Sequence, residues 1–160
     1  MTERKTRRVL IMEGARIGFP NFQGRKDDIN KNGARGCVVY FSDLEFAKEL
    51  SEEGWNVKFP EQPEGHDADT LVREPYLSLT ARYDNYPPAI YLVEPTSKMK
   101  ELLTEKTVEL IDTEDIIEVD LQIVPSHWSN ERSGESGVKA YIKEMYVVVE
   151  PTPFRGKYNY

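Results

Sequence analysis

Near the C-terminal end of the chain, the stretch GVKAYIKEMYVVVE (residues 137–150) combines flat aromatic rings with cations. Its β-branched and aromatic residues predict a strand, in which successive side chains point to opposite faces. The apolar set can therefore pack on a core, while Lys139, Tyr141 and Lys143 share the other face. Rings stack on bases and cations contact phosphates, so this pattern is typical of a surface that binds single-stranded nucleic acid.

A second strand is predicted directly before this one, at EVDLQIVPSHW, and the polar loop SNERSGES joins the two into a long hairpin. A hairpin that closes symmetrically pairs Ser126 with Lys139 and Gln122 with Lys143. It also places both apolar sets on one face, which is the register that burial requires. The same alternation adds Trp128 to the polar face.

Two further strands are predicted to contribute to the polar face. Lys58 points outward from WNVKF, whose three apolar residues point inward, and Tyr76 and Arg82 point outward from PYLSLTARY. The polar loop over residues 20–36 could close over such a face, as barrel loops do. The candidate nucleic-acid contacts are therefore Tyr141, Lys139, Lys143, Trp128, Tyr76, Arg82, Lys58, Phe22, Arg25 and Arg35.

A structural role for these residues stays open at this point. Aromatic residues and lysines are common on exposed strands, where they form cross-strand pairs and discourage aggregation at sheet edges. One residue also conflicts with the predicted register, because Glu144 falls on the apolar side of its strand. It must therefore lie near an edge or reach water.

The elements before the hairpin are predicted from alternation and from capping signals. VLIMEGARIGF reads as one strand, in which Gly14 and Gly18 mark possible bulges. SDLEFAKELSEEG is the clearest helix, because Ser42 and Glu45 form a capping box and Gly54 supplies a stop.

These patterns predict a mainly β fold with about seven strands and one or two short helices, the second beginning at Thr104. No repeat or βαβ alternation is visible, which argues against a parallel sheet. We therefore expect an OB-fold-like antiparallel β-barrel with extra hairpins over residues 9–150. A basic arm over residues 1–8 precedes this domain, and an aromatic and basic tail over residues 151–160 follows it.

Composition sets the broad class. The chain has 160 residues, of which 39% are hydrophobic and 31% are charged, as in an ordinary soluble domain. No apolar run of about 18 residues and no secretory signal are visible, so a membrane helix is not expected. Cys37 is the one cysteine, which favours a reducing, cytoplasmic setting without an internal disulfide. The net charge of −7 argues against indiscriminate binding to polyanions, although screening permits a local basic groove.

Catalytic and metal chemistry find little support in the sequence. His66, His127 and Cys37 lack the spacing of a zinc site, and neither a GxxxxGK[ST] loop nor a GxSxG motif occurs. Acidic residues such as Asp67 and Asp120, together with Lys139, could be taken for the site of a metal-dependent nuclease. The chain has 28 acidic residues, however, so such a combination is expected by chance. We therefore expect no catalysis, no metal and no cofactor.

Several stretches resemble a family of small tailed-phage and prophage proteins. FPNFQGR and GARGCVVYF resemble the start of these proteins, and DLEFAKELSEEGWNVKF, PPAIYLVE, VDLQIVPSHW and GVKAYIKEMYVVVE follow in the same order. The likeness covers residues 9–150, and GWNVKF and GVKAYIKEMY are its most specific parts. The family looks like phage single-stranded DNA-binding proteins with an oligonucleotide-binding barrel.

The resemblance implies a protein of the host-cell cytoplasm that coats single-stranded DNA in phage replication or recombination, without a cofactor. Its partners would be single-stranded DNA, phage replication or recombination proteins, and further copies of itself. One feature departs from many single-strand binders, because this chain ends in the aromatic and basic FRGKYNY rather than in an acidic tail. Recruitment of partners through an acidic terminus is therefore in doubt.

A protein-interaction module is the alternative. The net charge and the acidic stretch EQPEGHDADTLVRE would suit an acidic phage protein that inhibits a host nuclease or a defence factor by imitating DNA.

Overall fold

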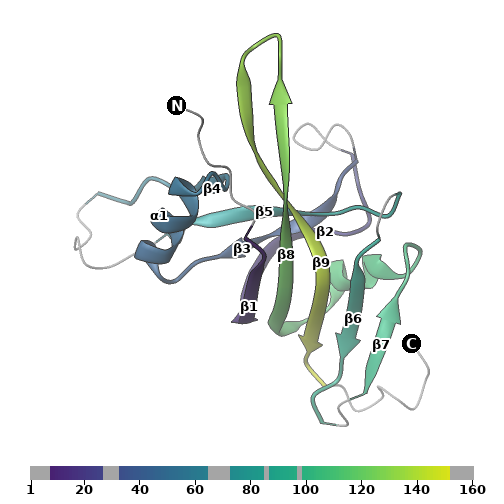
Figure 1. Cartoon of the computed structure of the whole chain (residues 1–160). Coiled ribbons are helices and arrows are strands. Elements are labelled where there is room, and N and C mark those ends of the chain that lie inside the picture. The colour runs from purple at the N-terminus through teal and green to yellow at the C-terminus, as the bar shows by residue number, and fades with distance from the viewer. Residues whose placement is uncertain (1–7, 27–32, 65–72, 85–86, 97–98, 152–160) are drawn as a thin grey trace.

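The structure is a computed structural model, which describes residues 8–26, 33–64, 73–84, 87–96 and 99–151 (Figure 1). The described residues form nine strands, one α-helix and one 3-10 helix. In chain order these elements are β1 (Leu10–Ala15), β2 (Ile17–Asn21), β3 (Arg35–Tyr40), α1 (Leu44–Glu52), β4 (Val57–Lys58), β5 (Tyr76–Ala81), β6 (Ala89–Val93), β7 (Lys100–Leu103), η1 (Val108–Thr113), β8 (Ile116–Asn130) and β9 (Glu135–Val149). Neither helix is long and apolar enough to cross a membrane.

The strands form one mixed sheet in the order β1-β8-β9-β5-β3-β2, with β4 beside β5 and β6 between β7 and β9. The predicted mainly β, OB-like class is confirmed. Two details of the prediction are wrong. The described strands do not close into a barrel, and β9 runs parallel to both β5 and β6. Long β-rich connections link these parallel strands, so the sequence shows no βαβ alternation that could have predicted them.

The hairpin of β8 and β9 is the longest feature of the sheet, and its tip rises beyond the other strands (Figure 1). Ser126 pairs with Lys139, as predicted. Gln122, however, pairs with Glu144 rather than with Lys143, because the register shifts by one residue at this point. Lys143 is therefore the extra residue of a β-bulge. The bulge turns Glu144 away from the apolar side, which resolves the conflict in the predicted register.

The core lies under one face of this sheet. It includes the predicted apolar sets of the hairpin, and the ring of Trp55 completes it from the segment after the helix. The prediction that Phe59 points inward is wrong, since its side chain is 46% exposed. Strand β4 ends at Lys58, so alternation no longer applies at the next residue.

Helix α1 is shorter than predicted at its start. Its N-cap is Asp43 rather than Ser42, because the Asp43 carboxylate accepts the backbone N–H groups of Glu45 (3.0 Å) and Phe46 (3.2 Å). A carboxylate in this position also suits the positive end of the helix dipole.

The C-terminal stop of α1 is confirmed at Gly54, whose φ of +105° is open to glycine. The N–H of Gly54 binds the carbonyl of Ser51, and the N–H of Trp55 binds the carbonyl of Leu50, both at 3.1 Å. This pair of bonds is a Schellman motif, in which the residue after the glycine packs back on the helix. The motif therefore positions the side chain of Trp55 in the core.

Two predicted elements differ from those in the structure. The single strand predicted at residues 9–19 is β1 followed by β2, which pair with different strands. The register of β1 shifts around Gly14 (φ +62°), so the bulge predicted there is confirmed. The short helix predicted from Thr104 is present as the 3-10 helix η1, but it begins later, at Val108, after β7 ends at Leu103.

Candidate nucleic-acid interface

The face of the sheet opposite the core carries the candidate site, which we call the outer face. Its side chains alternate with core residues on β5, β8 and β9, and register pairs them across the strands and with β3, where Val38 is itself buried outside the core. The residues of the outer face are Val38, Tyr40, Tyr76, Ser78, Thr80, Val124, Ser126, Trp128, Lys139 and Tyr141.

Tyr141 lies at the centre of the predicted ring-and-cation group. Its ring is half-buried, and the ammonium nitrogen of Lys139 lies 5.5 Å from the ring centroid. Beside it is an open depression of about 440 Å³, to which Arg82 and Lys143 contribute with Tyr141 and Ser126. The structure therefore brings four predicted contacts, Arg82, Lys139, Tyr141 and Lys143, to one place.

The charge of Arg82 is well defined in this group. Its Nε donates to Asp84 at 2.7 Å, and this hydrogen bond, with a smaller contribution from the Tyr141 hydroxyl, raises the pKa of the guanidinium. Arg82 is therefore always a cation, although Asp84 offsets part of its attraction for a phosphate.

Trp128 extends the outer face along the projecting part of the hairpin. Its side chain is 45% exposed, and it pairs in register with Gly137. A Cβ atom at Gly137 would lie 3.0 Å from Nε1 of the indole, so the ring lies flat over the glycine. This arrangement holds a large ring in place at a partly exposed position, where a base can reach it.

A second aromatic cluster lies where β3, β4 and β5 meet. Tyr40 and Tyr76 pack edge to face with their ring centroids 6.3 Å apart, and Lys58 pairs with Tyr76 in register. The Arg16 guanidinium lies 5.8 Å from the Tyr40 centroid. Tyr40 and Arg16 are not among the contacts predicted from the sequence. Alternation from buried Val39 would have placed Tyr40 outside.

Between the two clusters the surface is lined by small residues. Gly36 pairs with Thr80, and Gly18 pairs with Val38. A Cβ atom at Gly18 would overlap the hydroxyl end of Tyr40, and one at Gly36 would overlap a backbone carbonyl of β5. Both glycines thus permit close packing, since the Tyr40 ring lies over Gly18 and the backbone of β5 lies against Gly36. The short side chains of Ser78 and Thr80 form a low floor between the two clusters.

Two of the predicted contacts do not reach this face. Phe22 is fully buried, and its backbone N–H binds Asp112 of η1 at 2.7 Å. Arg35 donates to the backbone carbonyl of Glu105 at 2.6 Å, and its guanidinium lies 5.5 Å from the ring centroid of Tyr83. Phe22 and Arg35 therefore contact η1 and the residues before it, and neither lies on the outer face.

The remaining predicted contact, Arg25, is exposed in the turn after β2. The predicted arm over residues 1–8 lies outside the described residues except for Arg8, and the tail beyond Pro151 lies outside them as well.

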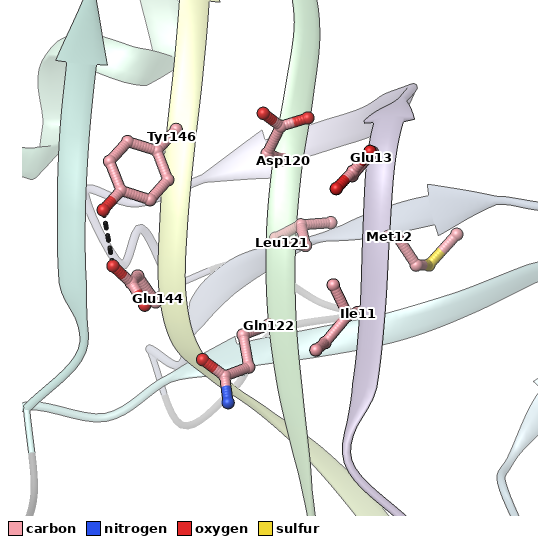
Figure 2. Close-up of a pocket in the computed structure, with 8 residues that line it drawn as sticks. All are labelled: Ile11, Met12, Glu13, Asp120, Leu121, Gln122, Glu144 and Tyr146. Carbon is pink, nitrogen blue, oxygen red and sulfur yellow. Dashed lines mark hydrogen bonds between the residues drawn. The ribbon is translucent and has the colours of Figure 1, made fainter.

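The far end of the same sheet face is acidic (Figure 2). Glu13, Asp120 and Glu144 line a depression of about 190 Å³ together with the exposed side chain of Ile11. Within the described residues, no lysine or arginine forms an ion pair with these three carboxylates. We call this region the acidic end. Glu144 accepts the hydroxyl proton of Tyr146 at 2.5 Å, which raises the pKa of that tyrosine.

The described residues contain no cluster of histidine, cysteine and carboxylate side chains suited to a metal ion. The thiol of Cys37 is buried, and desolvation raises its pKa to about 12. It is therefore a neutral core residue beneath the site and not a nucleophile.

Solved structures of phage proteins have a similar fold. A C-terminally truncated single-stranded DNA-binding protein from bacteriophage Enc34 matches with a TM-score of 0.54 at 10% identity, over 91% of this chain and 88% of that chain. A second structure of the Enc34 protein has a TM-score of 0.49 at 14% identity, covering 94% and 87%. The bacteriophage T7 single-stranded DNA-binding protein gp2.5 has a TM-score of 0.45 at 9% identity, covering 92% and 89%.

Comparison of the sequence with known proteins and family models identifies the family. No curated protein matches the chain. The family model described as "Putative phage ssDNA-binding domain" matches residues 1–159, which confirms the resemblance seen in the sequence. The chain therefore belongs to the family of phage single-stranded DNA-binding domains.

Proposed function

We propose that the protein binds single-stranded DNA on its outer face, without catalysis, in phage DNA replication or recombination. The observation that carries this proposal is the gathering of Lys139, Tyr141, Lys143 and Arg82 around one depression, on the fold of a phage single-strand-binding family. Bases stack on the rings, and the cations follow the phosphates.

The arrangement favours binding with little dependence on sequence. Every base has a flat π surface, and stacking on an aromatic side chain contributes about 1–3 kcal/mol per base. The low floor between the two aromatic clusters lets a strand lie close to the sheet. The acidic end repels phosphates, so the strand crosses the basic half of the face and avoids Glu13, Asp120 and Glu144.

The proposal is tested by fluorescence anisotropy with labelled oligo-dT and with a duplex of equal length at low salt. We expect the single strand to bind more tightly than the duplex. Tyr141→Ala should weaken binding about tenfold or more, and Lys143→Glu should weaken it and reduce its salt dependence, both without a change in fold.

Tyr91→Ala and Lys48→Glu are the matched controls. Tyr91 is also half-buried and stacks on Tyr146 at a centroid distance of 4.9 Å, but it lies toward the acidic end. Lys48 is an exposed lysine on α1. Both variants should bind like the wild type. If wild-type protein leaves the oligo-dT signal unchanged at low salt, the proposal fails.

The acidic end supports a second candidate, a protein-interaction module that binds a basic host factor such as a nuclease or a defence protein. Its three carboxylates form no ion pair within the described residues, and they would supply the negative field that imitates DNA. A host protein retained after nuclease treatment, and lost in the Glu13→Lys variant, would favour this function. Phage replication or recombination proteins and further copies of the chain are additional candidate partners.

A further inference from the structure

Phe19 on β2 is both strained and exposed. Among the described residues it is the one non-glycine residue with a positive φ, at +46°. A bulky side chain is strained in this region, and the following Pro20 restricts the backbone further. The ring is nevertheless 78% exposed, so its burial does not offset the strain. Strain that packing does not explain often marks a functional residue.

A β-bulge pushes this ring out of the sheet. Gly18 pairs with Val38 and Asn21 pairs with Gly36, so three steps along β2 match two steps along β3. The extra residue breaks the alternation that would otherwise turn position 19 toward the core. β2 is also the last strand in the order of the sheet, which leaves Phe19 at its edge.

The register connects this edge to the ring of Tyr141. Asn21 pairs with Gly36, Gly36 with Thr80, and Thr80 with Tyr141, so the row crosses β2, β3, β5 and β9. Three strand spacings amount to about 14 Å. Gly36 and Thr80 leave the middle of the row low, and Phe19 is two residues from its outer end.

An exposed cation, Arg25, follows β2 in the chain. The Asn21 side chain accepts the backbone N–H of Arg25 at 2.9 Å and donates to its carbonyl at 3.1 Å. These two bonds fix the backbone of Arg25 in the turn next to β2, and its side chain is exposed. This part of the chain therefore carries an exposed ring at the edge of the sheet and an exposed cation six residues further on.

We propose that Phe19 forms a second base-stacking subsite, where single-stranded DNA leaves the outer face over the edge of β2. Arg25 contacts a phosphate next to the base that stacks on Phe19. A strand long enough to cross the row binds both Tyr141 and Phe19, whereas a shorter one binds at Tyr141 alone. This inference rests on the proposed function and extends its binding path.

The test compares Phe19→Gly and Phe19→Leu with the wild type, using anisotropy with a series of oligo-dT lengths. Phe19→Gly should raise the melting temperature, because glycine adopts positive φ without strain, while it weakens binding of long oligonucleotides about tenfold. Phe19→Leu keeps the apolar bulk and the backbone strain but loses the flat ring, so it should weaken binding similarly at an unchanged melting temperature. Binding of the shortest oligonucleotides should not change.

Ile11→Ala is the matched control, since Ile11 is 73% exposed on the opposite edge strand β1, beside the acidic end. It should leave binding unchanged at every length. If both Phe19 variants bind long oligo-dT like the wild type while Tyr141→Ala weakens it, the Phe19 subsite is wrong and the proposed function stands. A Phe19 variant that changes the oligomeric state on size exclusion, with unchanged affinity, would instead assign Phe19 to a protein interface. If neither Tyr141→Ala nor Phe19→Leu weakens binding of oligo-dT, both proposals are overturned.

Discussion

At the scale of single residues, the extra residue Lys143 decides which charges share a surface. Without the bulge, side chains would alternate between the two faces along the whole of β9, and Glu144 would point into the core. With it, Lys143 lines the depression beside Tyr141, and Glu144 joins the acidic end. One inserted residue thus marks the border between the basic and acidic parts of a continuous sheet face.

The ring of Tyr141, rather than its hydroxyl group, should account for its part in binding. We expect Tyr141→Phe to keep oligo-dT affinity within about threefold, because the flat ring remains, and Tyr141→Ala to lose about tenfold or more. Anisotropy titrations of the two variants decide between ring and hydroxyl. Equal losses would show that the hydroxyl, through its contact with Arg82, matters more than stacking.

The Cys37 thiol should be inert in the folded protein. Its pKa of about 12 lies above the ordinary value of 9.0, so burial favours the neutral thiol. The unfolded chain loses the proton above about pH 9, so the contribution of Cys37 to stability is complete below that pH and declines toward pH 12. Labelling with a thiol reagent at pH 8 should require denaturant, and fast labelling of native protein would contradict the buried position.

At the scale of elements, the β8–β9 hairpin carries an aromatic ring beyond the rest of the sheet. Gly137→Ala should displace the indole of Trp128, because the new Cβ would lie 3.0 Å from Nε1. We expect a shift in tryptophan emission and a severalfold loss of oligo-dT affinity, with little change in melting temperature at this half-buried position near the hairpin tip. Ser136→Ala, a change at the exposed neighbouring residue, is the control. Unchanged emission would argue against this packing.

Elements with strong alternation were predictable from the sequence. The hairpin, β5 and the helix after Phe41 follow directly from apolar periodicity and capping signals, and they supply Tyr141, Lys139, Tyr76 and Arg82. Alternation gave the correct face for each of these residues until a bulge or a strand end interrupted it.

Features set by contacts distant in sequence were not predictable. The position of Phe22 depends on Asp112, which accepts the N–H groups of Phe22 and Gln23, so the burial of Phe22 was missed. The parallel pairing of β9 with β5 and β6 depends on the whole topology. Gly18 correctly marks a bulge in β2, but the exposed position of Phe19 depends on the pairing of β2 with β3, which the local sequence does not show.

At the scale of the whole molecule, a net charge of −7 coexists with a basic half-face. The affinity for single-stranded DNA should therefore fall steeply with salt. For single strands the slope of log K against log salt is about −0.7 per phosphate contacted. Contacts by Lys139, Lys143 and Arg82 would give a slope of roughly −2.

Glu13→Lys should test the acidic end in the same titrations. Removing a carboxylate from the end of the face weakens the repulsion of phosphates, so we expect a twofold to fivefold gain in affinity at low salt that disappears at about 1 M, where screening acts within about 3 Å. A gain that persists at high salt would indicate a direct new contact instead of a change in the field.

The most direct measurement is photocrosslinking of bromodeoxyuridine-substituted oligo-dT to the protein, followed by mass spectrometry of the linked peptides. The account predicts crosslinks at Tyr141 and Trp128, and at Tyr40 or Tyr76 when the strand is long enough. Crosslinks confined to Tyr91 and Tyr146, near the acidic end, would contradict a DNA path over the basic half of the outer face.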